Sequence, residues 1–267
     1  GWAALSAGAS NWQGMAVNAA GGVYCSSLAS ETDVYYAADG VTFGRLSTGL
    51  SLARLGADTY ANDIYGSNGL FGASDVYKQT NGTGAFSAMS VTNRKYSGFA
   101  GDGLGGVYAC TFNESGDYTG KIYKYNSGTS DFDLVHTSNK RFHGMCLDPV
   151  SGLMYLCEFG GDIYTYDGTT LTALGGTARN WTAITADASG NIWAAASGVD
   201  VFKRTLGAGA FTATTLGAKA YGGLVYNNVN SYLYCSVHNN DIYRANGTTS
   251  YSDGDKVQIR ATHETYE

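Results

Sequence analysis

The sequence predicts an all-β protein, a six-bladed β-propeller with four antiparallel strands per blade and its last blade closed by the N-terminal strand. One pattern of short apolar runs and tight turns begins at positions 12, 52, 96, 142, 181 and 221. A repeat of about 40 residues with several short strands per unit is typical of propeller blades. No stretch shows helical periodicity, and Gly is abundant, with 38 residues against one Pro.

Each copy opens with the strand that we expect nearest the axis. Its first residue is large and, in five copies, aromatic, and these opening residues are Trp12, Leu52, Tyr96, Phe142, Trp181 and Tyr221. Two positions later five copies carry a small residue, namely Gly14, Gly98, Gly144, Ala183 and Gly223. Inner strands converge on the axis, where bulky side chains would clash. Arg54 breaks this pattern in the second copy, which is the weakest of the six.

The other three strands of each copy follow in a fixed order. Asp or Asn opens the turn after the first strand, as at Asn18 and Asp187, because its side chain bonds the backbone two residues on. Second strands begin near positions 23, 64, 107, 154, 192 and 233, third strands at 33, 75, 121, 162, 200 and 241, and fourth strands at 43, 86, 132, 171 and 211.

The sixth outer strand is expected at the N-terminus. Trp2-Ala-Ala-Leu-Ser matches Phe86-Ser-Ala-Met-Ser, so residues 2–7 are predicted to pair beside Asp241–Ala245. The alternative is an open array with a stray N-terminal strand, which would leave unpaired strand edges.

A domain boundary is predicted near the C-terminus, with the propeller at 1–251 and a strand or linker toward a further module at 252–267. Residues 253–262 form an alternating segment outside the repeat. It resembles a strand of small β-modules in phage tail and bacterial surface proteins. The resemblance implies that the propeller is one module of a longer surface or virion protein.

Composition narrows the function classes. The net charge of −6 argues against nucleic acid as a partner, and no apolar run approaches the roughly 20 residues of a membrane helix. Five Cys at apolar positions favour small core residues over a disulfide framework.

The predicted ligand-binding site is a set of cations, each next to or near an aromatic residue that opens a copy. The residues are Arg94, Lys95, Tyr96, Lys140, Arg141, Phe142, Arg179, Trp181, Lys219 and Tyr221, with His143 and His238. Cations and rings at a channel mouth would suit an anionic or carbohydrate ligand. Alternatively, the cations pair with the aspartates that open third strands, which are Asp33, Asp75, Asp162, Asp200 and Asp241. No cofactor is expected; that ring of aspartates could hold Ca²⁺, although such residues more often cap their own turns.

Catalytic signals are sparse. His143, His238 and Glu158 could form an acid–base or metal-binding group, but the chain has no compact catalytic motif. Residues 187–193, Asp-Ala-Ser-Gly-Asn-Ile-Trp, resemble blades of the two-component-regulator and streptogramin-lyase (NHL-like) propellers. The resemblance implies a propeller fold and, from the lyase family, His and Glu acting with Mg²⁺, without assigning those roles to residues of this chain.

A non-catalytic binding module, extracellular, at the cell surface or virion-associated, is therefore the expected function. Its partner would be a glycan or a surface protein, as in an adhesin or tail fibre, beside other virion or surface subunits or further copies of itself. Two alternatives remain open: a self-assembling subunit of a fibre or filament, and a lyase or hydrolase with its site at the mouth of the central channel.

Overall fold

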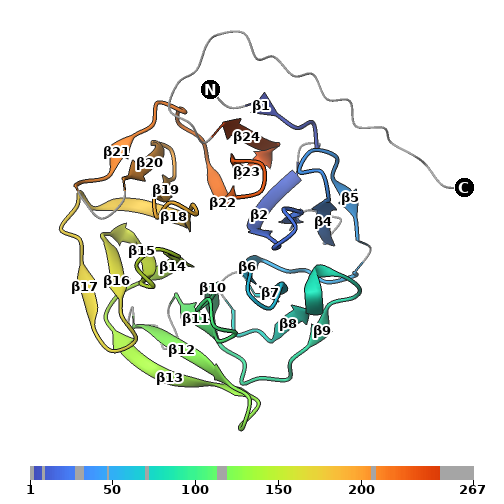
Figure 1. Ribbon diagram of the computed structural model, residues 1–267, viewed down its shortest axis with the longest axis vertical. Coiled ribbons are helices and arrows are strands. Elements are labelled where there is room, and N and C mark those ends of the chain that lie inside the picture. Colours follow the sequence, from blue (N-terminus) through green and yellow to red (C-terminus); the bar gives the residue numbers. More distant parts are fainter. Residues whose placement is uncertain are drawn as a thin grey trace, which may run out of the picture.

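The strands form a ring around a central axis (Figure 1). The structure is a computed structural model that describes residues 3–7, 10–27, 33–46, 48–69, 72–112, 119–205 and 209–246. These residues contain 24 strands and one short 3₁₀ turn, with no α-helix among them. The prediction of an all-β repeat fold is confirmed.

Strands adjacent in the chain pair antiparallel in sequence order. The first run contains β2 (Ser10–Val17), β3 (Val23–Ser27), β4 (Asp33–Ala37) and β5 (Gly44–Arg45). The second contains β6 (Arg54–Asp58), β7 (Asp63–Ser67), β8 (Val76–Gln79), the 3₁₀ turn Thr80–Gly82 and β9 (Ser87–Ala88). The third contains β10 (Tyr96–Gly101), β11 (Val107–Thr111), β12 (Gly120–Asn126) and β13 (Asp131–Ser138).

The second half of the chain repeats this arrangement. The fourth run contains β14 (Phe142–Leu147), β15 (Met154–Gly161), β16 (Ile163–Tyr166) and β17 (Leu171–Ala173). The fifth contains β18 (Arg179–Ala186), β19 (Ile192–Ala196), β20 (Asp200–Arg204) and β21 (Thr212–Ala213). The last contains β22 (Tyr221–Asn227), β23 (Tyr232–Asn240) and β24 (Ile242–Asn246), completed by β1 (Ala3–Ala4).

The described strands make two sheets of eight and two of four, which differs from the predicted set of separate four-stranded sheets. The reason is the length of β15 and β23. Their last residues pass the end of their own run and pair with the next inner strand, at Phe159↔Asn180 and Gly161↔Arg179 for β15. The corresponding pairs between β2 and β23 are Ser10↔Asn240 and Asn11↔His238.

The N-terminal strand pairs with the last strand of the repeat, as predicted. Ala3 and Ala4 of β1 pair with Arg244 and Tyr243 of β24, and the Leu5 amide donates to the Ile242 carbonyl at 2.8 Å. The open-array alternative is therefore wrong. Residues 252–267, and with them the predicted C-terminal module, lie outside the described residues, so that boundary remains a prediction.

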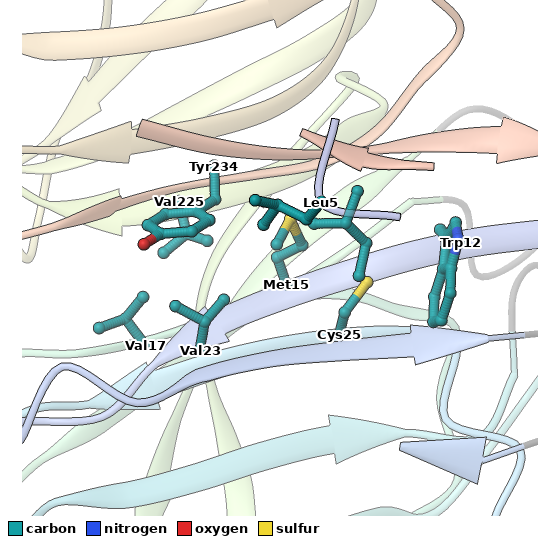
Figure 2. Close-up of a cluster of buried hydrophobic side chains, with 9 residues drawn as sticks. Leu5, Trp12, Met15, Val17, Val23, Cys25, Val225 and Tyr234 are labelled. Atoms are coloured by element: carbon teal, nitrogen blue, oxygen red, sulfur yellow. The ribbon is translucent and has the colours of Figure 1, made fainter. Parts of the chain in front are cut away.

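A hydrophobic cluster holds this closure together (Figure 2). Leu5, 2% exposed, packs with Met15 and Cys25 from the first run and with Val225 and Tyr234 from the last. Burying such side chains contributes about 1.5–3 kcal/mol each. The N-terminal segment thus stabilises the seam between the first and last parts of the repeat.

The inner strands touch backbone to backbone, which explains their small residues. A Cβ built on Gly14 would lie 2.4 Å from the Leu55 nitrogen, and one on Gly223 would lie 2.5 Å from the Gln13 carbonyl oxygen. Real Cβ atoms do not approach backbone so closely. Larger residues at these two positions would push neighbouring inner strands apart.

Candidate functional site

A cavity of about 370 Å³ occupies the centre of the ring. It is lined by inner strands β2, β6, β10, β14, β18 and β22, whose labels surround the axis in Figure 1. The volume falls in the range of about 300–1,000 Å³ that is usual for small-molecule sites. The walls are largely Gly and aliphatic, with a few polar side chains among them: Arg54, Ser97, His143 and Thr182 near the starts of the strands.

A β-bulge decides which residue faces this cavity in five of the six inner strands, all except β6. The pairing register shifts between Tyr96 and Gly98 in β10, and between Phe142 and Gly144 in β14. A bulge re-aims the side chains around it. The aromatic residue before the bulge therefore packs between sheets, and the residue inside it, Ser97 or His143, lines the cavity.

Arg54 reaches into the space that small residues leave open. It pairs with Ser67 in the register in which Gly98 pairs with Cys110 and Gly144 with Cys157. Its charge interacts with those two cysteines. Its charge also acts on His143 of β14 and His238 of β23. Because its charge acts on residues of the third, fourth and last runs, the Arg54 side chain lies close to the axis.

The Arg54 guanidinium has no counter-charge. The residue is 6% exposed, its Nε makes no hydrogen bond, and no carboxylate of the described chain lies within ion-pair distance of it. Burial lowers the pKa of Arg54 to about 10, so the group stays charged at neutral pH. Burial also raises the pKa of the Cys110 thiol to about 12, and that of Cys157 as well, so neither thiol supplies a negative charge.

His143 is held between two aromatic rings. Its imidazole stacks on Phe159 at 5.0 Å between centroids and meets Phe112 edge-on at 4.9 Å. Burial, and next the positive charge of Arg54, hold the pKa of His143 well below its usual range. The ring is therefore neutral at neutral pH and can accept a proton.

His238 lies at the same end of the inner strands and is fixed by amides. The Gln13 Nε2 and the His238 Nδ1 are 2.8 Å apart, and the same Nδ1 lies 3.2 Å from the Asn11 Oδ1. Burial, followed by the Arg54 charge, lowers the pKa of His238 too. Both imidazoles near the cation are therefore held neutral, by burial first and by the Arg54 charge second.

Two hydroxyl groups lie among the polar residues of the cavity wall. The Ser97 Oγ donates to the Cys110 carbonyl at 3.2 Å, and the Thr182 Oγ1 donates to the Ala195 carbonyl at 3.4 Å. With their hydrogens directed at the backbone, these hydroxyls present lone pairs to the cavity. Arg54 is therefore the strongest hydrogen-bond donor in its wall.

The six cations of the predicted ligand site lie elsewhere. Arg94 pairs with Asp131 at 3.4 Å, and Lys140 lies 3.9 Å from Glu158. Five of the six also lie over aromatic rings, in the pairs Arg94–Tyr123, Lys140–Tyr164, Arg141–Phe159, Arg179–Phe202 and Lys219–Tyr243. Lys95 is half-buried beside Arg94. None of the six is among the residues that line the cavity.

The predicted stacking aromatics are core residues. Tyr96, Phe142, Trp181 and Tyr221 are at most 3% exposed and belong to clusters between neighbouring sheets. Their rings are therefore closed to a ligand. Of the predicted set, His143 alone lines the cavity, and His238 lies within reach of the Arg54 charge.

The aspartates that open third strands bind their own surroundings. Asp162 accepts from the amides of Ile163, Gly175 and Gly176, and Asp33 pairs with Arg45 at 2.6 Å. Arg94 and Lys140 have Asp131 and Glu158 as ion-pair partners, and the charge of Asp162 also acts on Lys140. Pairing of the other cations with the third-strand aspartates stays a prediction. Glu158 also accepts from the Tyr164 hydroxyl at 2.8 Å, so it is engaged away from the histidines.

The donor set does not fit a metal ion. Within the described ranges, no group of three or more His, Cys, Asp or Glu side chains could hold one. The positive charge of Arg54 beside both histidines would also oppose a divalent cation. Neither the Ca²⁺ alternative nor the Mg²⁺ implied by the lyase resemblance agrees with these residues, so no chemical step is assigned to a metal.

Arg54 is the residue that the sequence-based site missed. Its signal was present: a long charged side chain stands where five other copies have Gly or Ala. By sequence alone, the Arg at this position indicates only that the second copy is the weakest of the six. In the structure, it marks the one inner strand that fills the space left by the others.

Comparisons with known proteins show the fold. No protein-family model and no curated protein matches the chain. A gluconolactonase from Xanthomonas campestris superposes with a TM-score of 0.70 at 12% identity, over 91% of this chain and 88% of its own. A structural-genomics protein assigned as a gluconolactonase gives 0.72 at 13%, over 91% and 90%. A streptogramin B lyase gives 0.61 at 12%, over 91% and 96%.

At these identities the similarity establishes a β-propeller repeat fold. The expectation of a non-catalytic binding module is contradicted, because the proteins that share this fold over nine-tenths of the chain include two named as gluconolactonases and a lyase. The alternative of an enzyme at the channel mouth agrees better with these neighbours.

The part of the chain that the structure describes contains no helix with the length and apolar character of a membrane span.

Proposed function

We propose that this protein is a hydrolase that cleaves a small ester or lactone at the Arg54–His143 end of its central cavity. One observation carries the proposal: a buried cation without a counter-charge shares a ligand-sized cavity with a neutral histidine. Such groups suit a reaction in which negative charge develops on an oxygen atom. The gluconolactonases of the same fold are lactone-specific by name and support the choice of bond.

The chemistry needs a proton acceptor and an oxyanion partner. His143 takes a proton from water as the water oxygen attacks the carbonyl carbon. Arg54 stabilises the oxyanion of the tetrahedral intermediate. The carbon–oxygen bond to the leaving alkoxide then breaks, and the imidazolium returns its proton to that alkoxide. The products are an alcohol and a carboxylic acid, or one hydroxy acid where the substrate is a lactone.

The cavity walls favour this chemistry. Gly98, Gly144 and Gly223 present backbone instead of side chains, and the aliphatic neighbours contribute no competing charge. In a site of low polarity, a fixed guanidinium acts on a developing charge far more strongly than it would in water.

His143→Phe tests the reaction. The new ring keeps the aromatic packing against Phe112 and Phe159 and removes the proton acceptor. We expect hydrolysis of glucono-δ-lactone, followed by pH-stat titration, to fall by at least about 100-fold. His136→Phe is the matched control, since His136 packs on Tyr166 in the outer part of the ring.

Product analysis in ¹⁸O-water separates the chemical classes. Hydrolysis places the label in the new carboxylate, whereas an elimination yields an unsaturated product without label. Full activity of His143→Phe, or a rate that falls equally in the His136 control, would contradict the assigned role. Chelation with EDTA is expected to leave the rate unchanged, because the residues present do not fit a metal.

We also infer that each eight-stranded sheet is two four-stranded blades joined at one corner, giving six blades. Support comes from the brevity of the junctions, which consist of two residue pairs between β15 and β18 and two between β2 and β23. Within each run, the strands pair in sequence order from the axis outward.

A further inference from the structure

We infer that Arg54 is the receptor for a single carboxylate group, and that the cavity therefore binds small monovalent hydroxycarboxylates. Naming hydroxy acids as the ligand rests on the proposed lactone hydrolysis; the carboxylate site itself rests on Arg54. The inference begins with a charge imbalance. A buried guanidinium without a counter-ion is costly, since the effective penalty is several kcal/mol per ion even after relaxation.

No group of the described chain stabilises this cation. Its Nε lacks a hydrogen-bond partner, and the nearby ionisable groups, Cys110, Cys157, His143 and His238, are neutral at neutral pH. Several other buried or half-buried charges in the ring are paired, as in Lys78–Asp63 at 2.6 Å and Arg45–Asp33. No described residue supplies that partner, so we infer that a bound ligand does.

Charge and shape select a carboxylate. A guanidinium is a planar fork that matches both oxygens of a carboxylate. One cation balances one negative charge. Arg141, whose charge also acts on His143, lies over the Phe159 ring and does not line the cavity. A phosphate dianion on Arg54 would therefore remain half-neutralised by the lining residues. Ser97 and Thr182 present lone pairs rather than hydrogens, which suits the hydroxyl groups of a ligand better than a second anionic group.

The surroundings define the rest of the ligand. Leu55, Ile184 and Leu224 line the cavity and offer apolar surface to a carbon chain or ring. The cavity of about 370 Å³ has room for a molecule of sugar-acid size. A hydroxy acid formed by hydrolysis would fit with its carboxylate on Arg54, so the enzyme should be inhibited by its own product.

Calorimetry with sodium gluconate tests the inference on the intact chain. Gluconamide serves as the neutral isostere, and sodium chloride at equal ionic strength serves as the simple anion. We expect gluconate to bind and both controls to bind at least about 10-fold more weakly. Arg54→Met should weaken gluconate binding by about 10- to 100-fold, the loss expected for a charge-assisted hydrogen-bonding partner.

Arg94→Met is the matched control, because it removes an equal charge that is already paired with Asp131. It should bind gluconate like the wild type. Equal binding of gluconate and gluconamide, equal binding of chloride, or equal losses in the two variants would each overturn the carboxylate assignment.

The outcomes also separate this inference from the proposed function. Lactone hydrolysis without gluconate binding would leave the hydrolase and remove the carboxylate receptor. Arg54-dependent gluconate binding without turnover of any lactone would do the reverse.

Discussion

Replacing Arg54 with methionine should make the protein more stable, although it removes the central group of the proposed site. Methionine keeps most of the aliphatic length of the side chain and loses its charge. Natural active sites often hold such groups at the expense of stability. The variant therefore tests whether the cation is truly without a partner in the ligand-free ring.

The magnitude follows from burial of the charge. The pKa of Arg54 falls to about 10 in the folded protein. Since one pKa unit corresponds to about 1.4 kcal/mol, the penalty relative to a solvated guanidinium is about 3 kcal/mol. For a domain of this size, about 2–4 °C accompanies each kcal/mol, so the melting temperature of Arg54→Met should rise by about 6–12 °C.

The pH dependence gives a second check. Below about pH 10, Arg54 is charged in both the folded and the unfolded chain, and the penalty is present in full. As the pH rises through that value, the folded protein releases the proton first, and the penalty shrinks. The stability difference between Arg54→Met and wild type should therefore be constant near neutrality and decrease above about pH 10.

Thermal unfolding followed by circular dichroism gives the melting temperatures, and urea denaturation at several pH values gives the pH dependence of the stability difference. Arg94→Met is again the control: it breaks a partly exposed ion pair and should cost at most about 1 kcal/mol. A melting temperature of Arg54→Met equal to or below that of the wild type would refute the reasoning, because it would mean that the fold already compensates the cation.

Four further substitutions test the ring and its turns. Gly14→Ala should destabilise by about 1–3 kcal/mol, because its Cβ would meet the Leu55 nitrogen at 2.4 Å, whereas Gly144→Ala, with its nearest atom at 3.6 Å, should be tolerated. Leu5→Ala should lower the free energy of unfolding by about 2–5 kcal/mol, and a loss below about 1 kcal/mol would mean that the N-terminal strand does not close the ring. Burial raises the pKa of Asp58, whose Oδ2 makes no hydrogen bond. The wild type therefore loses stability as pH rises through that pKa, so Asp58→Asn should gain about 1 kcal/mol near neutrality and nothing near pH 3; a gain that persists in acid would contradict this.

Sequence periodicity was sufficient for the repeat because its signals are local. Turn residues such as Asn18 and Asp187, and the small residues at Gly14 and Gly223, report backbone requirements that hold within one copy. The match between the N-terminal segment and Phe86–Ser90 likewise predicted the pairing of Ala3 and Ala4 with β24. Self-similarity carries such information without knowledge of the contacts.

The site depended on features that a linear pattern does not contain. The bulge after each aromatic turns Tyr96 and Phe142 into the core and His143 toward the axis, so the residues expected at the mouth were displaced by one position. The charge of Arg54 acts on His143 and His238 only because strands from distant copies converge on one axis. Local sequence patterns specify the strands and turns of each copy. Which side chains share the cavity follows only from closure of the ring, because their positions depend on bulges and on contacts between copies.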